Sequence, residues 1–144
     1  MSGDVQEMFL NVRMREVDKK YHRILVKKEN GVWPYEFQVF PFGNPCSASA
    51  AVGAAHLAAN KMQESHPLAA EAIREDTLID DTLKSTESVE QLIELKDQLI
   101  EVYESIGMNI RKFASNSEVF MKTVPQDKCS PDFDISGILS LIHI

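Results

Sequence analysis

The stretch Asp76-Thr77-Leu78-Ile79-Asp80-Asp81-Thr82-Leu83-Lys84 sets two adjacent carboxylates between two short apolar flanks. Both flanks contain β-branched residues, so the pattern predicts a tight hairpin with acid at its tip. Adjacent carboxylates repel one another, and a fold tolerates them best in open solvent or where a cation neutralises them. The stretch alone leaves two interpretations open: a solvated turn, for which Asp is a favoured residue, and a cation site.

Downstream of this hairpin the sequence predicts a long amphipathic helix. Ser88-Val89-Glu90-Gln91 has a capping-box pattern, and we expect the helix that it opens to run to Ile106. The apolar side chains at helical spacing form one stripe that we expect in the core: Leu92, Leu95, Leu99, Val102, Tyr103 and Ile106. Gly107 is suited to end the helix, and residues 108–111 alternate like a strand.

Upstream of the hairpin, two helices are predicted. The Ala-rich run from Ser47 to Met62 has high helix propensity, and its small side chains allow another backbone to approach closely. Pro67 interrupts the pattern, and Leu68 to Glu75 forms a second helix that leads into the acidic hairpin.

The N-terminal part of the chain predicts strands. Asp4 stands at the end of a strand that continues into a helical turn, and residues 16–21 are typical of a short polar turn. Residues 23–27 then form a strand, Asn30-Gly31 is a strong hairpin signal, and Val32 to Phe40 is the returning strand.

The composition is that of one ordinary domain. The chain has 144 residues, 44% of them hydrophobic and 26% charged, which excludes disordered and fibrous classes. Its apolar runs are too short to cross a bilayer, and the first residues lack the pattern of a secretory signal. Cys46 and Cys129 have no partner spacing, so we expect reduced thiols and an intracellular, cytoplasmic protein.

Charge is unevenly distributed along the chain. The net charge is -7, yet residues 13–28 hold seven basic side chains against two acidic ones. A solvated face and a surface that follows a nucleic-acid backbone are both open interpretations of this basic run.

Four segments, in this order, resemble the palm domain of reverse transcriptases, most closely the Bel/Pao branch of retrotransposons. They are Gly3-Asp4-Val5-Gln6-Glu7-Met8-Phe9, Val39-Phe40-Pro41-Phe42-Gly43-Asn44-Pro45, Leu78-Ile79-Asp80-Asp81, and Gly107-Met108-Asn109-Ile110-Arg111-Lys112-Phe113-Ala114-Ser115-Asn116. The resemblance covers residues 3–120 and departs from the family at Leu78, where a Tyr is usual.

The resemblance implies a site for two Mg²⁺ ions, because nucleotidyl transfer uses paired metal ions and Mg²⁺ prefers carboxylate oxygens. Asp4, Asp80 and Asp81 would be the metal ligands. Lys112 would lie near the departing pyrophosphate, where a cation stabilises developing charge. Each residue also has an ordinary interpretation: Asp4 as a helix N-cap and Lys112 as a solvent-exposed lysine.

Two further segments would border the substrates. In the family an aromatic at the position of Phe9 closes the nucleotide pocket against a 2′-hydroxyl, and the turn at Phe42 and Gly43 borders the base and the template. A core phenylalanine and an ordinary strand-to-helix turn are the alternatives.

We therefore expect an α+β fold, an incomplete polymerase palm with a small antiparallel sheet backed by helices. Residues 1–120 would be a partial reverse transcriptase palm with part of the fingers, and residues 121–144 an irregular tail. The expected function is RNA-directed DNA synthesis on a template-primer with deoxynucleotides, the chain being a fragment too short to act alone. The alternative is a catalytically inactive or domesticated palm that binds a partner or has a structural role.

Overall fold

The centre of the fold is a four-stranded antiparallel sheet with the strand order β4-β5-β1-β6. In the computed structural model, which describes residues 1–130, the strands are β1 (Ser2–Gln6), β4 (Thr77–Leu78), β5 (Asp81–Leu83) and β6 (Asn109–Ala114). The N-terminal strand β1 lies between two strands that come much later in the chain. The hairpin and the segment near Asp4, far apart in sequence, are therefore neighbours in the sheet.

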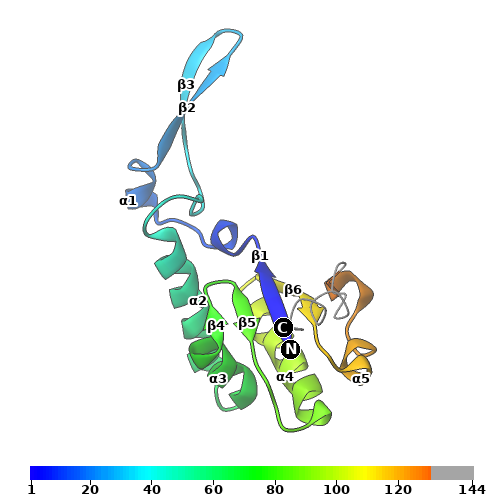
Figure 1. Ribbon diagram of the computed structural model, residues 1–144. Helices are drawn as coiled ribbons and strands as arrows, with labels where there is room; N and C mark the ends of the chain where they lie inside the picture. Colours follow the sequence, from blue (N-terminus) through cyan, green and yellow to red (C-terminus); the bar gives the residue numbers. More distant parts are fainter. Residues whose placement is uncertain (131–144) are drawn as a thin grey trace, which may run out of the picture.

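Three helices pack beside this sheet: α2 (Ser47–Met62), α3 (Pro67–Glu75) and α4 (Val89–Glu104) (Figure 1). Val5 of β1 and Phe113 of β6 share one buried cluster with Leu99 of α4. Successive side chains of a strand point to opposite faces, so Asp4 lies on the face that the helices leave open. The expected α+β class, a small antiparallel sheet backed by helices, is confirmed.

Small side chains let α2 and α3 pack closely. The buried residues of both helices are mostly alanines: Ala51, Ala55, Ala58, Ala59, Ala69, Ala70 and Ala72. Alanine loses no side-chain entropy in a helix, so the same residues favour the helices and their close packing. The predicted bounds of α2 are confirmed, and α3 begins one residue earlier than predicted, at Pro67.

The two ends of α4 are fixed by local hydrogen bonds. At the start, the Ser88 hydroxyl accepts a hydrogen bond from the Gln91 amide at 3.2 Å, as the capping pattern predicts. At the end, Gly107 adopts φ 75° and the Met108 amide donates to the Tyr103 carbonyl at 3.0 Å. The helix ends at Glu104, so its predicted extension to Ile106 is wrong by two residues.

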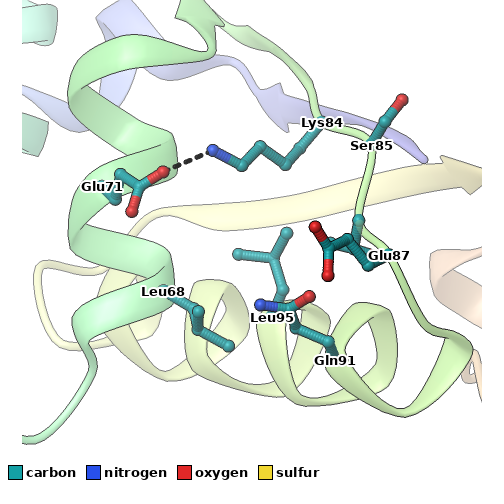
Figure 2. Close-up of a pocket in the computed structure, with 8 residues that line it drawn as sticks. Leu68, Glu71, Lys84, Ser85, Glu87, Gln91 and Leu95 are labelled. Atoms are coloured by element: carbon teal, nitrogen blue, oxygen red, sulfur yellow. Dashed lines mark hydrogen bonds and ion pairs between the residues drawn. The ribbon is translucent and has the colours of Figure 1, made fainter.

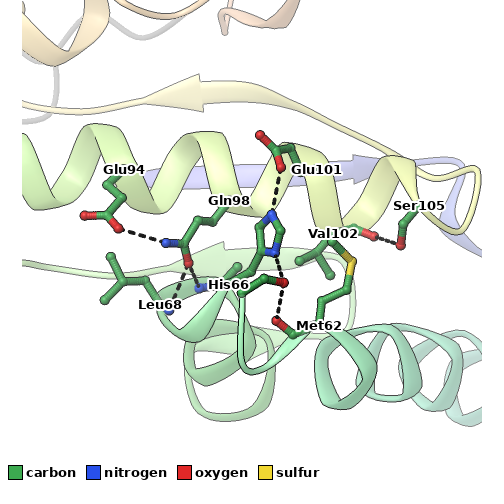
Figure 3. A network of polar contacts seen from close by, with 10 residues as sticks. Met62, His66, Leu68, Glu94, Gln98, Glu101, Val102 and Ser105 are labelled. Atoms are coloured by element: carbon green, nitrogen blue, oxygen red, sulfur yellow. Dashed lines mark hydrogen bonds and ion pairs between the residues drawn. The ribbon is translucent and has the colours of Figure 1, made fainter.

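A polar network joins the start of α3 to α4 (Figure 3). Gln98 accepts hydrogen bonds from the Leu68 and Ala69 amides at 3.0 and 3.2 Å, and these amides have no partner within their own helix. His66 lies 2.7 Å from Glu101 and 2.7 Å from the Ser65 hydroxyl. Gln98 of α4 therefore caps the first turn of α3, and His66 links the loop before α3 to Glu101 of α4.

A second, two-stranded sheet is formed by β2 (Arg23–Lys28) and β3 (Gly31–Glu36), and it projects away from the rest of the molecule (Figure 1). The predicted returning strand to Phe40 is wrong in its end, because β3 stops at Glu36. Beyond it, the Gln38 carbonyl accepts from Met14 and Val39 bridges Arg13, partners that β2 does not provide.

Short helical turns complete the described residues. The segment predicted as a polar turn contains the single-turn helix α1 (Glu16–Lys19), and η1 (Met8–Asn11) follows β1 as predicted. Near the end, α5 (Glu118–Met121) packs against α4, and η2 (Gln126–Lys128) packs against β6, where Phe113 forms a β-bridge with Cys129. The expected tail from 121 is therefore ordered as far as 130, and its part from 131 to 144 lies outside the described residues. Between residues 1 and 130, no helix has both the length and the apolar character needed to cross a membrane.

Candidate functional site

The strand register brings Asp4 and the acidic hairpin together. Asp4 of β1 is paired directly with Asp81 of β5, and the Val5 amide donates to the Asp80 carbonyl at 2.8 Å. Directly opposite residues of an antiparallel pair share a face, with Cβ atoms about 4.5–5.5 Å apart. The three predicted carboxylates therefore come from two segments more than seventy residues apart and meet at one end of the sheet.

The hairpin that carries Asp80 is tight. Leu78 pairs with Asp81, so only Ile79 and Asp80 form the loop between β4 and β5. Ile79 adopts φ 61°, a left-handed conformation that is rare for a β-branched residue. The predicted hairpin is thus confirmed, and its backbone is held in a conformation that local preference disfavours.

A buried hydroxyl cluster lies beneath this hairpin. The Thr77 and Thr82 hydroxyls, one on each strand, are 2.9 Å apart, and Thr82 is fully buried. The adjacent Tyr103 hydroxyl of α4 is buried without a hydrogen bond of good geometry. Burial raises the pKa of Tyr103, so the phenol stays protonated and packs under the hairpin as a neutral group.

Lys112 reaches the carboxylates because of a β-bulge. The pairing of β1 with β6 shifts register between Ser2 and Asp4, and Lys112 in the bulge adopts φ 54°. Its Nζ lies 3.2 Å from Asp4 Oδ2, with the lysine side chain 51% exposed and the aspartate 25% exposed. A bulge re-aims a side chain, and here it points a cation at the carboxylate that the resemblance assigns to metal.

Positive-φ residues gather at this site. Within residues 1–130, three residues other than glycine have positive φ: Glu7, Ile79 and Lys112. Glu7 and Lys112 line the cavity described next, and Ile79 precedes Asp80. Each such conformation costs roughly 1–3 kcal/mol and persists only where the surrounding structure imposes it. The strain is concentrated where the carboxylates meet.

A small cavity of about 230 Å³ opens beside the carboxylates. Five of the seven predicted site residues line it: Asp4, Phe9, Phe42, Asp80 and Lys112. The Phe9 and Phe42 rings lie 5.1 Å apart at 60°, so they form one aromatic wall from two segments. The structure brings these predicted residues together around a single opening.

The other two predicted residues lie at the edge of this group. Asp81 faces Asp4 across the strand pair, and Gly43 follows Phe42 in a turn with φ 82°. A left-handed φ favours glycine there, and the space around its Cα is open.

The acidic groups influence one another electrostatically. Partial desolvation raises the pKa of Asp81, the charges of Asp80 and Asp4 raise it further, and Lys112 lowers it. Asp81 is therefore within electrostatic reach of both other carboxylates and of the lysine. A divalent cation would relieve the repulsion that raises the Asp81 pKa.

The donor set suits a hard cation, because carboxylate oxygens are the ligands that Mg²⁺ prefers. The side chains of residues 1–130 form no group of three or more His, Cys, Asp or Glu already arranged around one metal position. Asp4 instead pairs with Lys112. Asp4, Asp80 and Asp81 would be the residues to hold a metal ion, once Asp4 is released by the lysine.

Arg111 is a residue of this site that the sequence did not single out. Arg111 of β6 lies opposite Asp4 in the strand register and lines the same cavity. Its Nε is buried without a hydrogen-bond partner. The alternation of the predicted strand would have indicated it, because the residue facing Asp4 must lie on the same face of the sheet.

A larger cavity, of about 590 Å³, lies elsewhere, between α3, α4 and the loop after β5 (Figure 2). Its lining includes Leu68 and Leu95, with Lys84 pointing at Glu71. Hydrogen bonds from Lys84 to Asp76 and Glu71, each 2.6 Å, raise the pKa of the lysine and keep it paired. This cavity therefore presents a neutralised cation, unlike the acidic opening beside Asp4.

Compared with protein-family models and with curated proteins, the chain finds no match in either set.

Proposed function

We propose that this chain is the palm part of an RNA-directed DNA polymerase of the Bel/Pao retrotransposon type, an enzyme whose reaction is template-directed nucleotidyl transfer. One observation carries the proposal: Asp4 of β1 lies directly opposite Asp81 of β5, and Asp80 lies in the loop that joins β4 to β5. The order of the four sequence segments does not require this register, so the pairing is an independent observation that supports a shared carboxylate site.

The proposed roles follow from where each residue lies. Asp4, Asp80 and Asp81 would hold two Mg²⁺ ions, which when bound activate the primer 3′-oxygen and neutralise the triphosphate. Lys112, now 3.2 Å from Asp4, would move its charge toward the leaving pyrophosphate. Lysine suits this exchange because its ammonium sits on a flexible stem.

The aromatic wall would select the sugar. Phe9 and Phe42 line the opening next to Asp4, where bulk excludes a 2′-hydroxyl and favours deoxynucleotides. The turn at Gly43 would border the template. The partners are then an RNA or DNA template-primer and deoxynucleotides. With Cys46 and Cys129 as free thiols, the proposed location is intracellular and cytoplasmic.

Two observations favour a second candidate, a non-catalytic palm that binds a partner or has a structural role. Lys112 already pairs with Asp4, and Leu78, at the position where the family has Tyr, is 78% exposed. In this alternative the acidic hairpin is a solvated turn held by the lysine.

Primer extension separates the two candidates. The assay uses an RNA template annealed to a DNA primer, deoxynucleotides and Mg²⁺, and compares the wild type with Asp80→Asn. Exposed Glu64→Gln, between α2 and α3, is the matched control for loss of one negative charge. Polymerase function predicts Mg²⁺-dependent extension by the wild type and the control that Asp80→Asn abolishes. Equal background in all three would refute polymerase activity of this chain by itself. Mn²⁺ binding that Asp80→Asn leaves unchanged would then leave the non-catalytic palm.

A further inference from the structure

The β2–β3 hairpin exposes nearly all of its side chains. Every residue of β3 is exposed, as are five of the six residues of β2, and the hairpin stands away from α2, α3, α4 and the larger sheet (Figure 1). An isolated two-stranded hairpin is only marginally stable in water. Its apolar and aromatic side chains therefore stay on the surface without contributing to the core.

The register separates these side chains into two faces. One face carries the Ile24–Tyr35 and Val26–Trp33 pairs together with Lys28, and we call it the aromatic face. The opposite face carries the pairs Arg23–Glu36, Leu25–Pro34 and Lys27–Val32. Trp33 is 52% exposed and Tyr35 is 42% exposed, so the aromatic face offers open ring surface.

The hairpin region is basic although the chain is acidic. Residues 19–36 hold five basic side chains against two acidic ones, whereas the rest of the chain holds ten against twenty. Arg23 is paired with Glu36 at 2.6 Å. The Lys28 ammonium instead lies 4.8 Å from the Tyr35 ring centroid and contacts its hydroxyl, so it stays positioned on the aromatic face.

A hollow of about 460 Å³ lies at the tip of the hairpin, lined by Lys28, Glu29, Asn30 and Trp33. It combines an indole plane, an ammonium, an amide and a carboxylate. An indole stacks on a base, an ammonium attracts a phosphate, and an amide or carboxylate can bond a base edge. These are the elements with which proteins hold unpaired nucleotides.

We propose that the aromatic face binds single-stranded nucleic acid, with a base stacked on Trp33 and a phosphate at Lys28. Ring faces of bases are open only in single strands, which disfavours a duplex. The excess of basic side chains in residues 19–36 of an otherwise acidic chain favours a polyanion over an ordinary protein surface. This surface is separate from the carboxylate site, so the inference goes beyond the proposed function and does not depend on it.

Trp33 is the chain's single tryptophan, so its fluorescence reports directly on this surface. The full chain is titrated with 12-nucleotide poly-dT and poly-U, excited at the red edge of the indole band. Stacking on Trp33 predicts saturable quenching of the fluorescence by both oligonucleotides. A lower dissociation constant for poly-dT or for poly-U identifies DNA or RNA as the better ligand. Absence of quenching by both overturns the proposal.

Variants are compared by anisotropy of the labelled oligonucleotide. Trp33→Leu keeps an apolar side chain but no ring, and weakens binding about 5-fold to 150-fold, the loss for one base stack. Trp33→Phe retains stacking and most of the affinity. If Trp33→Leu binds as tightly as the wild type, the stacking role is wrong. Because these side chains lie outside the core, both variants are expected to fold like the wild type, and circular dichroism verifies this.

The two neighbouring lysines provide a matched pair on opposite faces. Lys28→Gln reduces the slope of log affinity against log salt by about 0.7, the value for one phosphate contact to a single strand. Lys27→Gln, with the same charge change on the other face, leaves the slope near that of the wild type. Equal effects of the two variants contradict a site on the aromatic face.

Concentration-dependent self-association that Trp33→Leu abolishes, without oligonucleotide binding, shows a protein interface instead and also overturns the proposal.

Failure of this proposal is distinguishable from failure of the proposed function. Primer extension with Asp80→Asn tests only the proposed function, and oligonucleotide binding with Trp33→Leu tests only this surface. Glu64→Gln, a charge change outside both the acidic hairpin and the β2–β3 hairpin, leaves oligonucleotide binding unchanged. If Glu64→Gln and Trp33→Leu reduce binding equally, the hairpin is not the binding surface and the inference is wrong.

Discussion

Gly3→Ala tests whether β1 must pass closely over the aromatic core to place Asp4. A Cβ at Gly3 would lie 3.0 Å from Phe113 Cε1 and 3.2 Å from Ile110 Cδ1. Phe113 is fully buried, so its ring would have to shift within the packed core to accept the new methyl group. Overpacking of this kind costs typically about 1–3 kcal/mol. For a chain of this size, that corresponds to a melting temperature lower by about 4–12 °C.

Gly53→Ala is the matched control, with the same added methyl group and the opposite expected sign. Gly53 lies within α2, and no atom approaches within 4 Å of the Cβ that the substitution would add. Alanine is the better helix former, so this variant gains about 0.8–1 kcal/mol. Urea unfolding of both variants at neutral pH gives the two free energies. A Gly3→Ala stability within about 0.5 kcal/mol of the wild type, the usual range for surface changes, would refute the close packing at β1.

Two further predictions concern the groups around and beneath the acidic hairpin. The pKa of Asp81 is raised in the folded state, so ionisation of this carboxyl disfavours folding at neutral pH. We therefore expect Asp81→Asn to be more stable than the wild type. The expected gain is roughly 0.2–1 kcal/mol, the range for like charges directly opposite each other in a strand pair. That difference shrinks as pH falls through the raised pKa and vanishes below 3.8; a difference that stays constant from pH 7 to pH 3 in urea titrations contradicts the pairing. Tyr103→Phe removes a buried hydroxyl without a well-formed hydrogen bond, so thermal unfolding is expected to show equal or slightly higher stability, whereas a loss above about 1 kcal/mol means that Thr77 or Thr82 bonds it strongly.

Local patterns were sufficient for most elements of the fold. The alanine run gave the bounds of α2, Asn30-Gly31 gave the turn between β2 and β3, and the Ser88 cap gave the start of α4. The end of β3 was missed because it depends on hydrogen bonds from the segment around Met14, which no local pattern contains.

The candidate site was only partly predictable. The residue types at Asp4, Asp80 and Asp81 were named from the ordered segments, but their register depends on which strands pair across the sheet. The β-bulge was not foreseen, because lysine at φ 54° runs against backbone preference and glycine would mark such a position. The Lys112–Asp4 ion pair follows from that bulge, whereas Arg111 lies opposite Asp4 in the regular part of the register.

The measurement that tests the central claim most directly is Mn²⁺ binding, followed by electron paramagnetic resonance of the free ion. Mn²⁺ replaces Mg²⁺ at oxygen ligands. The titration compares the wild type, Asp4→Asn and the charge-matched control Glu64→Gln. If Asp4 meets the acidic hairpin in one cation site, the wild type and the control bind saturably and Asp4→Asn binds at least about tenfold more weakly. The same titration curve for all three proteins would contradict the claim.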